Sequence, residues 1–313
     1  MLQTGAADHN RILAKVAEWA GAPMALATVI ETWRSAPCPV GTHMLVHSDG
    51  AFVGSVSGGC VEGDVLQAAA DVIDGASATV RRYGVADGAA WEVGLPCGGN
   101  IAVLVQPVGC QGFSPELFDR IIAANAVGDA LKIATDLDSG ISEVVATRDA
   151  DRFLNVYAPP KRLIIVGAVE IAAVLAAIAQ QIGFAATVVD PRARFLTEDR
   201  FAGVMRDDRW PDDAVTALKP DSRTAVVTLS HDIKIDDPGL VAALASPAAY
   251  VAALGSKSSH AARLVRLRAM GIAEDQLARI EGPAGVPLNA ISASEIALSI
   301  AAGMVRVMND GLR

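Results

Sequence analysis

Hydrophobic and polar positions change their spacing along the first half of the chain. Residues 11–20 place Ile12, Val16 and Trp19 on one side of a helix. Short apolar runs follow, bounded by glycine, proline or an Asp-Gly pair, which is typical of antiparallel strands and hairpins. The first half is therefore predicted to be a mixed α/β domain. The pattern predicts strands over 24–31, 43–47, 51–56, 79–83 and 101–105 and a helix over 61–73.

From residue 161 onward the apolar runs are continuous, and helical segments separate them. Continuous apolar strands are typical of a parallel sheet that helices cover on both faces. This half is therefore predicted to be a Rossmann-like, doubly wound parallel-sheet domain. The segment Ser292-Ala293-Ser294-Glu295 has the pattern of a capping box, which predicts a final helix over 295–309. We predict strands over 162–166, 185–189, 224–229 and 250–254 and a helix over 170–182.

A length of 313 residues fits about two domains. We expect an N-terminal domain over residues 1–110 and the Rossmann-like domain over residues 161–313. Residues 111–160 are expected to connect them, with a helix over 114–126 and a final linker over 151–160.

Composition and charge narrow the classes of function. Hydrophobic residues make up 52% of the chain and charged residues 19%, which excludes a disordered or fibrous protein. Lys and Arg number 26 against 35 Asp and Glu, a net charge of −9, and the sequence pI is about 5.0. Such a charge repels phosphate backbones and anionic lipids, so we expect no nucleic-acid partner and no membrane partner.

The N-terminal residues suggest a cytoplasmic location. Residues 1–10 are small and polar and lack the basic start and apolar run of a secretory signal, and no apolar run reaches the length of a spanning helix. The four cysteines lie within the first 110 residues and form no C-x-x-C pair. In a reducing cytosol we expect them to be free thiols, and a zinc ribbon is poorly supported.

Two glycine–cysteine turns are the most distinctive local pattern. The first contains Ser57, Gly58, Gly59 and Cys60, and the second contains Cys97, Gly98 and Gly99. Consecutive backbone N–H groups at a glycine pair can turn toward one point and form an anion nest. The two turns could together surround an oxyanion or a sulfur-ligated metal. The alternative is two tight turns with inert cysteines, since free cysteine is usually a buried, small apolar residue.

A dinucleotide-binding fingerprint is only partly present. The fingerprint needs G-x-G-x-x-G at the first strand-to-helix turn, and Gly167-Ala168-Val169-Glu170 keeps the first glycine alone. The branched Val169 and the charged Glu170 both oppose a pyrophosphate there. Asp190 ends the second predicted strand, where an acid would bind ribose hydroxyls. Alternatively, Asp190 and Arg192 pair with each other.

Two further strand ends belong to the same edge of the predicted sheet. His231 and Asp232 follow one strand, and Gly255, Ser256 and Lys257 follow the next. Ligands of open α/β sheets bind at this edge, and a lysine there would help to hold a phosphate. We therefore expect a functional crevice, whereas a serine hydrolase is a poorer interpretation because no G-x-S-x-G elbow occurs.

Taken in order, these motifs resemble the xanthine dehydrogenase accessory (XdhC/CoxI) family over nearly the whole chain. The resemblance rests on 54–62, 94–99, 189–192, 229–232, 254–257 and 282–299. It implies a cofactor-handling N-terminal domain and a Rossmann-like C-terminal domain. It also implies a maturation factor that binds molybdenum cofactor, as molybdopterin or its dinucleotide form, and assists its sulfuration or its insertion into a molybdenum hydroxylase. Xanthine dehydrogenase, aldehyde oxidoreductase and carbon monoxide dehydrogenase are hydroxylases of this kind.

On this interpretation Cys60 and Cys97 lie near the molybdenum or carry sulfur, because soft thiolates suit both roles. Ser57 and the glycines beside the two cysteines would bind the cofactor, together with residues at the strand ends of the second half. These strand-end residues are Gly167, Asp190, Arg192, His231, Asp232, Gly255, Ser256 and Lys257. The implied partners are an apo molybdenum hydroxylase and a cysteine desulfurase, and the sequence leaves open a homodimer.

The chain departs from the family pattern on its nucleotide-facing half. The family commonly has Gly-Ala-Gly-His where this chain has Gly167-Ala168-Val169-Glu170, a glycine at Ala252, and Pro-x-Gly-Leu where this chain has Pro283-Ala284-Gly285-Val286. These changes bear on dinucleotide binding. The alternative functions are an oxidoreductase that binds NAD or FAD in the Rossmann-like domain, and a non-catalytic docking protein.

Overall fold

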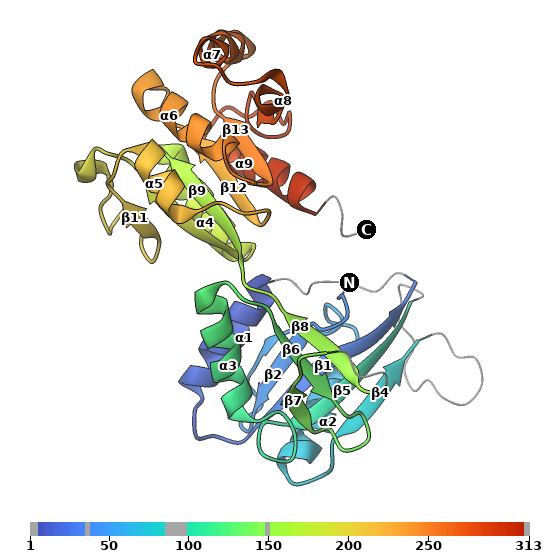
Figure 1. Cartoon of the computed structure of the whole chain (residues 1–313). Helices are drawn as coiled ribbons and strands as arrows, with labels where there is room; N and C mark the ends of the chain where they lie inside the picture. Colours follow the sequence, from blue (N-terminus) through green and yellow to red (C-terminus); the bar gives the residue numbers. More distant parts are fainter. Residues whose placement is uncertain (1–5, 35–37, 85–98, 148–150, 310–313) are drawn as a thin grey trace. The chain divides into compact units, whose positions relative to one another are not determined.

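A computed structural model describes residues 6–34, 38–84, 99–147 and 151–309 (Figure 1). The chain divides into a first unit, residues 1–159, and a second unit, residues 160–313. A mixed α/β fold with antiparallel sheets in the first unit and a six-stranded parallel sheet in the second confirms the predicted fold class.

The first unit is built on a five-stranded antiparallel sheet with the order β3-β2-β1-β5-β4. The long central strand β1 pairs with β2 on one side and with β5 on the other. A register shift between Val29 and Glu31 interrupts the pairing of β1 with β5. The strands are β1 (Met24–Trp33), β2 (His43–His47), β3 (Phe52–Gly54), β4 (Thr79–Tyr83) and β5 (Asn100–Pro107).

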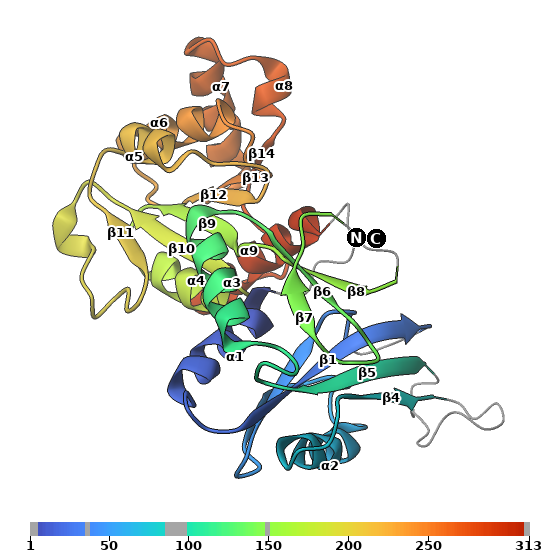
Figure 2. The same cartoon turned by 60° about the horizontal axis from the view of Figure 1, so that its bottom comes forward.

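Alternating side chains of this sheet enter two different cores, as the twofold period of a strand requires. Ala27 and Val103 face helix α2 (Glu62–Ile73), which packs Val65 and Ala69 against them. Leu26 and Leu45 face the other side of the sheet. That side is covered by α1 (Ala6–Glu18) and α3 (Pro115–Val127). Figure 2 shows these two helices on one face of the sheet and α2 on the other, while Figure 1 gives a second view of the same elements.

The segment after α3 differs from the expected connector. It forms a three-stranded antiparallel sheet with the order β7-β6-β8, so the expected linker over 151–160 contains a strand. The apolar side chains Ile133 and Tyr157 of this sheet enter the same core as Leu26, which explains why the segment is ordered. Its strands are β6 (Leu131–Thr135), β7 (Ser142–Val144) and β8 (Phe153–Tyr157).

A buried polar network ties the small sheet to the large one. His43 is 3% exposed, and its Nδ1 lies 2.9 Å from Thr28 Oγ1 while its Nε2 lies 2.9 Å from the Tyr157 hydroxyl. Burial, followed by repulsion from His9, holds the pKa of His43 well below its usual range. His43 is therefore a neutral structural histidine.

The second unit contains a six-stranded sheet with the order β11-β10-β9-β12-β13-β14, and every neighbouring pair is parallel. The chain order along the sheet reverses between β9 and β12, which is the topological switch point of a Rossmann-like fold. The strands are β9 (Lys161–Val166), β10 (Phe184–Val189), β11 (Met205–Asp207), β12 (Thr224–Thr228), β13 (Tyr250–Ala253) and β14 (Ile280–Glu281).

Helices cover both faces of the parallel sheet. One face packs Leu175 of α4 (Glu170–Gln181) and Ile300 of α9 (Ala293–Met308) against strand side chains. The other face packs α5 (Pro211–Leu218), α6 (Ile233–Leu244) and α7 (Lys257–Ala269). The short helices are η1 (Ala193–Phe195) and α8 (Glu274–Leu277).

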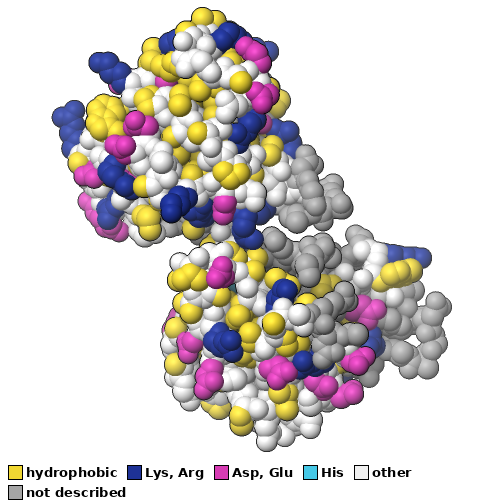
Figure 3. All heavy atoms as spheres, viewed as in Figure 1, with side chains coloured by type: hydrophobic (Ala, Val, Ile, Leu, Met, Phe, Trp, Pro, Cys, Tyr) yellow, Lys and Arg dark blue, Asp and Glu magenta, His cyan; other side chains and the backbone are white. Residues whose placement is uncertain are grey.

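The expected capping box is present: Ser292 and Glu295 cap α9 reciprocally. Among the helices that the structure describes, none is both long and apolar enough to cross a bilayer. Acidic and basic side chains are interspersed on the face shown in Figure 3.

Because His43 is neutral when folded, we expect the stability of the first unit to depend on pH. In the unfolded chain this histidine titrates near pH 6.5, whereas in the folded unit it stays neutral, so stability is lost as pH falls below about 6.5. We expect the free energy of unfolding to fall by roughly 1 kcal/mol between about pH 7.5 and about pH 5.5 from this group. Urea unfolding followed by tryptophan fluorescence measures it. In His43→Gln the pH difference should shrink by that amount, and an unchanged difference would contradict the assignment.

Candidate functional site

The first glycine–cysteine turn joins β3 to α2 and closes around one carboxylate. Glu62, the first residue of α2, is 8% exposed and directs its side chain back into the turn. Its oxygens accept hydrogen bonds from the hydroxyls of Ser55 and Ser57 and from backbone N–H groups. Those N–H donors are Val56 at 3.2 Å, Ser57 at 2.9 Å, Gly59 at 2.8 Å and Val61 at 3.3 Å.

This arrangement is an anion nest that the chain fills with its own carboxylate. Burial opposes ionisation of Glu62, but the hydrogen bonds from Ser55 and Ser57 outweigh burial and lower its pKa to about 2. Gly58 and Gly59 have φ values of 74° and 115°, the left-handed region that lets consecutive N–H groups turn inward. The nest predicted from the sequence thus exists, and its donors bind Glu62.

Cys60 lies at the outer side of this turn. Its thiol is free and its side chain exposed, while its backbone N–H donates to Ser57 Oγ at 3.0 Å. The thiol of Cys60 is therefore accessible, while the hydrogen bonds to Glu62 hold the backbone of the turn in place. Cys97 and Gly98 lie outside the described residues, and Gly99 is buried directly before β5. Within the described ranges, no group of three or more His, Cys, Asp or Glu side chains could hold a metal ion.

In the second unit, the turn between β9 and α4 lies against the turn after β12. Gly167 has φ 102°, and a Cβ there would lie 2.7 Å from the backbone nitrogen of Ser230. Because that neighbour is backbone, no larger residue fits. The first glycine of the partial fingerprint is therefore required by the close approach of two strand ends, at the edge where the sheet reverses its order.

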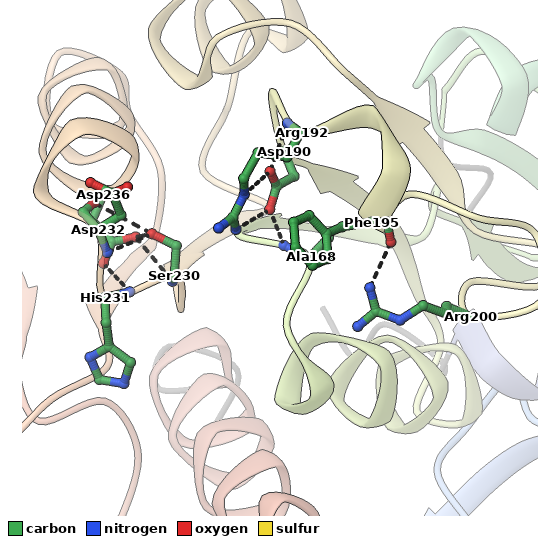
Figure 4. A network of polar contacts seen from close by, with 9 residues as sticks. All are labelled: Ala168, Asp190, Arg192, Phe195, Arg200, Ser230, His231, Asp232 and Asp236. Carbon is green, nitrogen blue, oxygen red and sulfur yellow. Dashed lines mark hydrogen bonds and ion pairs between the residues drawn. The ribbon is translucent and has the colours of Figure 1, made fainter.

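Asp190, at the end of β10, is fully buried and saturated with donors from the chain itself. Its carboxylate accepts from Ala168 N at 2.7 Å and from Arg192 N at 2.9 Å, Nε at 2.8 Å and Nη2 at 2.7 Å (Figure 4). Burial raises the pKa of Asp190, but the hydrogen bonds from Arg192 and Ala168 lower it by a larger amount. The pKa of Asp190 is therefore below its usual value. The pairing of Asp190 with Arg192, one of the two sequence-based alternatives, is the arrangement in the structure.

The turn after β12 repeats this principle with a third carboxylate. Asp236 of α6 is 2% exposed and accepts from Ser230 N at 3.1 Å, Ser230 Oγ at 2.7 Å and His231 N at 3.0 Å (Figure 4). Burial raises the pKa of Asp236 although the bonds from Ser230 oppose this. His231 has φ 61° and an exposed side chain, and Asp232 caps α6 by accepting from Lys234 N at 2.9 Å.

The turn after β13 is a helix cap. Ser256 is the N-cap of α7 and accepts from Ser259 N at 3.1 Å, while its hydroxyl lies 2.8 Å from that of Ser258. Gly255 has φ 143°, and Lys257 is exposed in the first turn of the helix. These residues lie at the C-terminal end of the sheet, as predicted.

A pocket of about 460 Å³ opens beside the turn between β9 and α4. Arg192, which the sequence predicted as a site residue, lines this pocket together with Arg194, Phe195 and Arg200, which were not predicted. Figure 4 shows Arg192, Phe195 and Arg200 near the end of β10. The signal was present in the sequence as three arginines within nine residues after the second strand, around one aromatic residue. The remaining lining residues are Ala168, Val169 and Glu170.

The Glu62 nest predicts the behaviour of a Glu62→Gln variant. Glutamine keeps one acceptor oxygen, but its amide N–H groups would face the donors of the turn. We expect the first unit to lose about 2 kcal/mol of stability, since charge-assisted hydrogen bonds lose their acceptor. In the natural protein this stabilisation is present above pH 4.5 and is lost as pH falls toward about 2. Urea unfolding measures both effects.

The matched control for that variant is Asp71→Asn. Asp71 lies on the same helix and accepts one exposed hydrogen bond from Gln67 at 3.1 Å. Its replacement should change stability by less than about 0.5 kcal/mol. Equal losses of stability in the two variants would show that the hydrogen bonds to Glu62 stabilise the unit no more than the exposed carboxylate of Asp71 does.

Comparisons with known proteins agree with this two-unit architecture. Two family models match, the XdhC and CoxI family over residues 18–84 and the XdhC Rossmann domain over residues 163–304. The molybdenum cofactor insertion chaperone PaoD of Escherichia coli (strain K12) is 28% identical over 96% of this chain and 89% of its own length. A protein of Bacillus subtilis (strain 168) described as a probable subunit of xanthine dehydrogenase is 24% identical over 90% of this chain and 92% of its own.

A solved structure supports the fold as well. The crystal structure of a xanthine dehydrogenase from Bacillus halodurans superposes with a TM-score of 0.81 at 24% identity, covering 97% of this chain and 96% of that one. Both halves of the chain thus match their family models in the expected order, and the chain belongs to the XdhC and CoxI family.

Proposed function

We propose that this chain is a maturation factor that binds molybdenum cofactor as its cargo and assists its insertion into a molybdenum hydroxylase. The observation that carries the proposal is the alignment of 96% of the chain with PaoD, which is named as a molybdenum cofactor insertion chaperone. The sequence motifs of both halves support it, since they occur in the order typical of the family.

In this proposal Cys60 is the residue of the first unit that contacts the metal end of the cargo. A thiolate is a soft ligand that suits molybdenum and sulfur chemistry. The turn supplies what such a ligand needs, namely exposure of the thiol and a backbone that Glu62 holds in one conformation. Cys97 is proposed as a second thiol with the same role.

The partners follow from the same proposal. The recipient is an apo molybdenum hydroxylase, of the xanthine dehydrogenase, aldehyde oxidoreductase or carbon monoxide dehydrogenase type. If the cargo is sulfurated while bound, a cysteine desulfurase supplies the sulfur. A homodimer is the assembly proposed for the chain itself.

An oxidoreductase that binds NAD or FAD is the second candidate, because the strand order of the second unit is that of dinucleotide-binding folds. Two observations oppose it. Asp190 is enclosed by donors of its own unit, so its oxygens do not face a ribose. Val169 occupies the position of the glycine that lets the pyrophosphate approach. A flavin absorption band near 450 nm in the purified protein would favour this candidate.

The test is the molybdenum and pterin content of the full chain after anaerobic purification from cells that make the cofactor. We expect molybdenum in the natural protein and at least a fivefold lower content in Cys60→Ala. The matched control is Cys110→Ala, because Cys110 is also an exposed free thiol of the first unit. We expect that control to retain its molybdenum.

The outcomes separate the proposals. Molybdenum that falls in Cys60→Ala alone supports Cys60 as the metal-proximal thiol. Molybdenum retained equally in all three proteins keeps the carrier role and removes Cys60 from the site. A natural protein that binds no molybdenum or pterin under these conditions overturns the carrier role.

A further inference from the structure

The pocket beside the β9–α4 turn is cationic in a chain of net charge −9. Three arginines line it, and Glu170 is the single acidic lining residue. Guanidinium groups are the side chains best suited to phosphate, because they present several N–H donors in one plane. The local charge therefore favours an anionic ligand although the chain as a whole repels one.

The three arginines differ in how many of their N–H donors already bind groups of the protein. Arg192 gives Nε and Nη2 to Asp190, and Arg200 donates from Nη1 to the carbonyl oxygen of Phe195 at 2.7 Å. Arg194 is exposed, and its guanidinium lies over the Phe195 ring with 5.4 Å between its Cζ and the ring centroid. Over the described ranges it makes no hydrogen bond or ion pair, so its N–H donors are free to bind a ligand.

The aromatic ring holds two of these cations at the pocket. Arg192 also lies over Phe195, with its Cζ 4.6 Å from the ring centroid, so the ring orders both guanidinium groups. Ala168 and Val169 add an apolar wall. An apolar wall beside a few charged donors, in a pocket of about 460 Å³, is typical of a small-molecule site, and here it suits a ligand with an apolar face and an anionic end.

Asp190 indicates which part of a ligand this pocket selects. An acid at this strand end would accept hydrogen bonds from the two hydroxyls of a ribose. Here Arg192 and Ala168 use its lone pairs, and its side chain is 0% exposed. Apart from Glu170, the charged side chains that remain for a ligand are the donors Arg194 and Arg200. Charged N–H donors bind a phosphate oxygen better than a hydroxyl.

We propose that this pocket binds a phosphate monoester of a planar heterocycle, with Arg194 as its main phosphate-binding residue and Arg192 and Arg200 around it. Glu170 weakens this binding and excludes an extended pyrophosphate along the turn. The proposal does not rest on the proposed function, because it requires neither molybdenum nor Cys60. The phosphate could belong to a free nucleotide or to a pterin that carries a phosphate.

The test uses the full-length protein and calorimetric titration at low salt, with adenosine 5′-monophosphate, inorganic phosphate and adenosine as probes. We expect adenosine monophosphate to bind, inorganic phosphate to compete with it, and adenosine to bind at least tenfold more weakly. Arg194→Ala should raise the Kd for the monophosphate at least tenfold, and Arg194→Lys should restore part of the affinity. Glu170→Gln should lower the Kd severalfold.

Arg268→Ala is the matched control, because Arg268 is an exposed arginine of the same unit that pairs with Glu274. Its Kd should equal that of the natural protein. Replacement of Arg194 breaks no hydrogen bond within the described residues, so thermal unfolding should stay unchanged and a loss of binding can be assigned to the site. Equal affinity of Arg194→Ala and Arg268→Ala would overturn the proposal, as would equal affinity for adenosine and its monophosphate.

Material released by acid from the purified protein distinguishes the two sources of phosphate. Adenine absorbance that disappears in Arg194→Ala identifies a nucleotide, and pterin fluorescence that disappears identifies a phosphorylated pterin. A natural protein that binds none of the phosphate probes overturns the site, whatever its molybdenum content. The molybdenum content of the natural protein and of Cys60→Ala tests the carrier role separately.

Discussion

A buried carboxylate must find hydrogen-bond donors within the protein, because its desolvation is otherwise too costly. Glu62, Asp190 and Asp236 are all at most 8% exposed, and each takes its donors from the backbone of a turn that follows a strand. The conformations of these turns depend on that requirement. The loops at which ligands would be expected are thus fixed from within before any ligand binds.

The same requirement restricts how a ligand can be recognised. Backbone N–H groups that bind Glu62 or Asp190 are not available to an external phosphate or oxyanion. In the proposals made above, recognition therefore falls to exposed side chains beside these turns, Cys60 in the first unit and Arg194 in the second. A soft thiol and a hard cation have different chemistry, so the two units are suited to different kinds of ligand atom.

Sequence patterns predicted those elements whose burial is simple. In the parallel sheet, β9, β10, β12 and β13 are largely apolar on both faces, and each lies within a residue of its predicted range. The three strands after α3 were missed because β6 and β8 are short, only partly buried and stabilised by pairing with distant residues. The glycine nest was predicted from Gly58 and Gly59, but its occupant was not, since local spacing does not show that Glu62 turns back toward the strand.

A dinucleotide fingerprint combines residues that the fold needs with residues that the ligand needs, and this chain separates the two. Gly167 is needed by the fold, because a Cβ there would meet the backbone of Ser230 at 2.7 Å. Val169 has φ −88°, which any residue adopts, so the fold places no such demand on it. The second glycine of the fingerprint serves only the close approach of a pyrophosphate. A chain that keeps the first glycine and lacks the second has retained the Rossmann-like architecture without the constraint of that ligand.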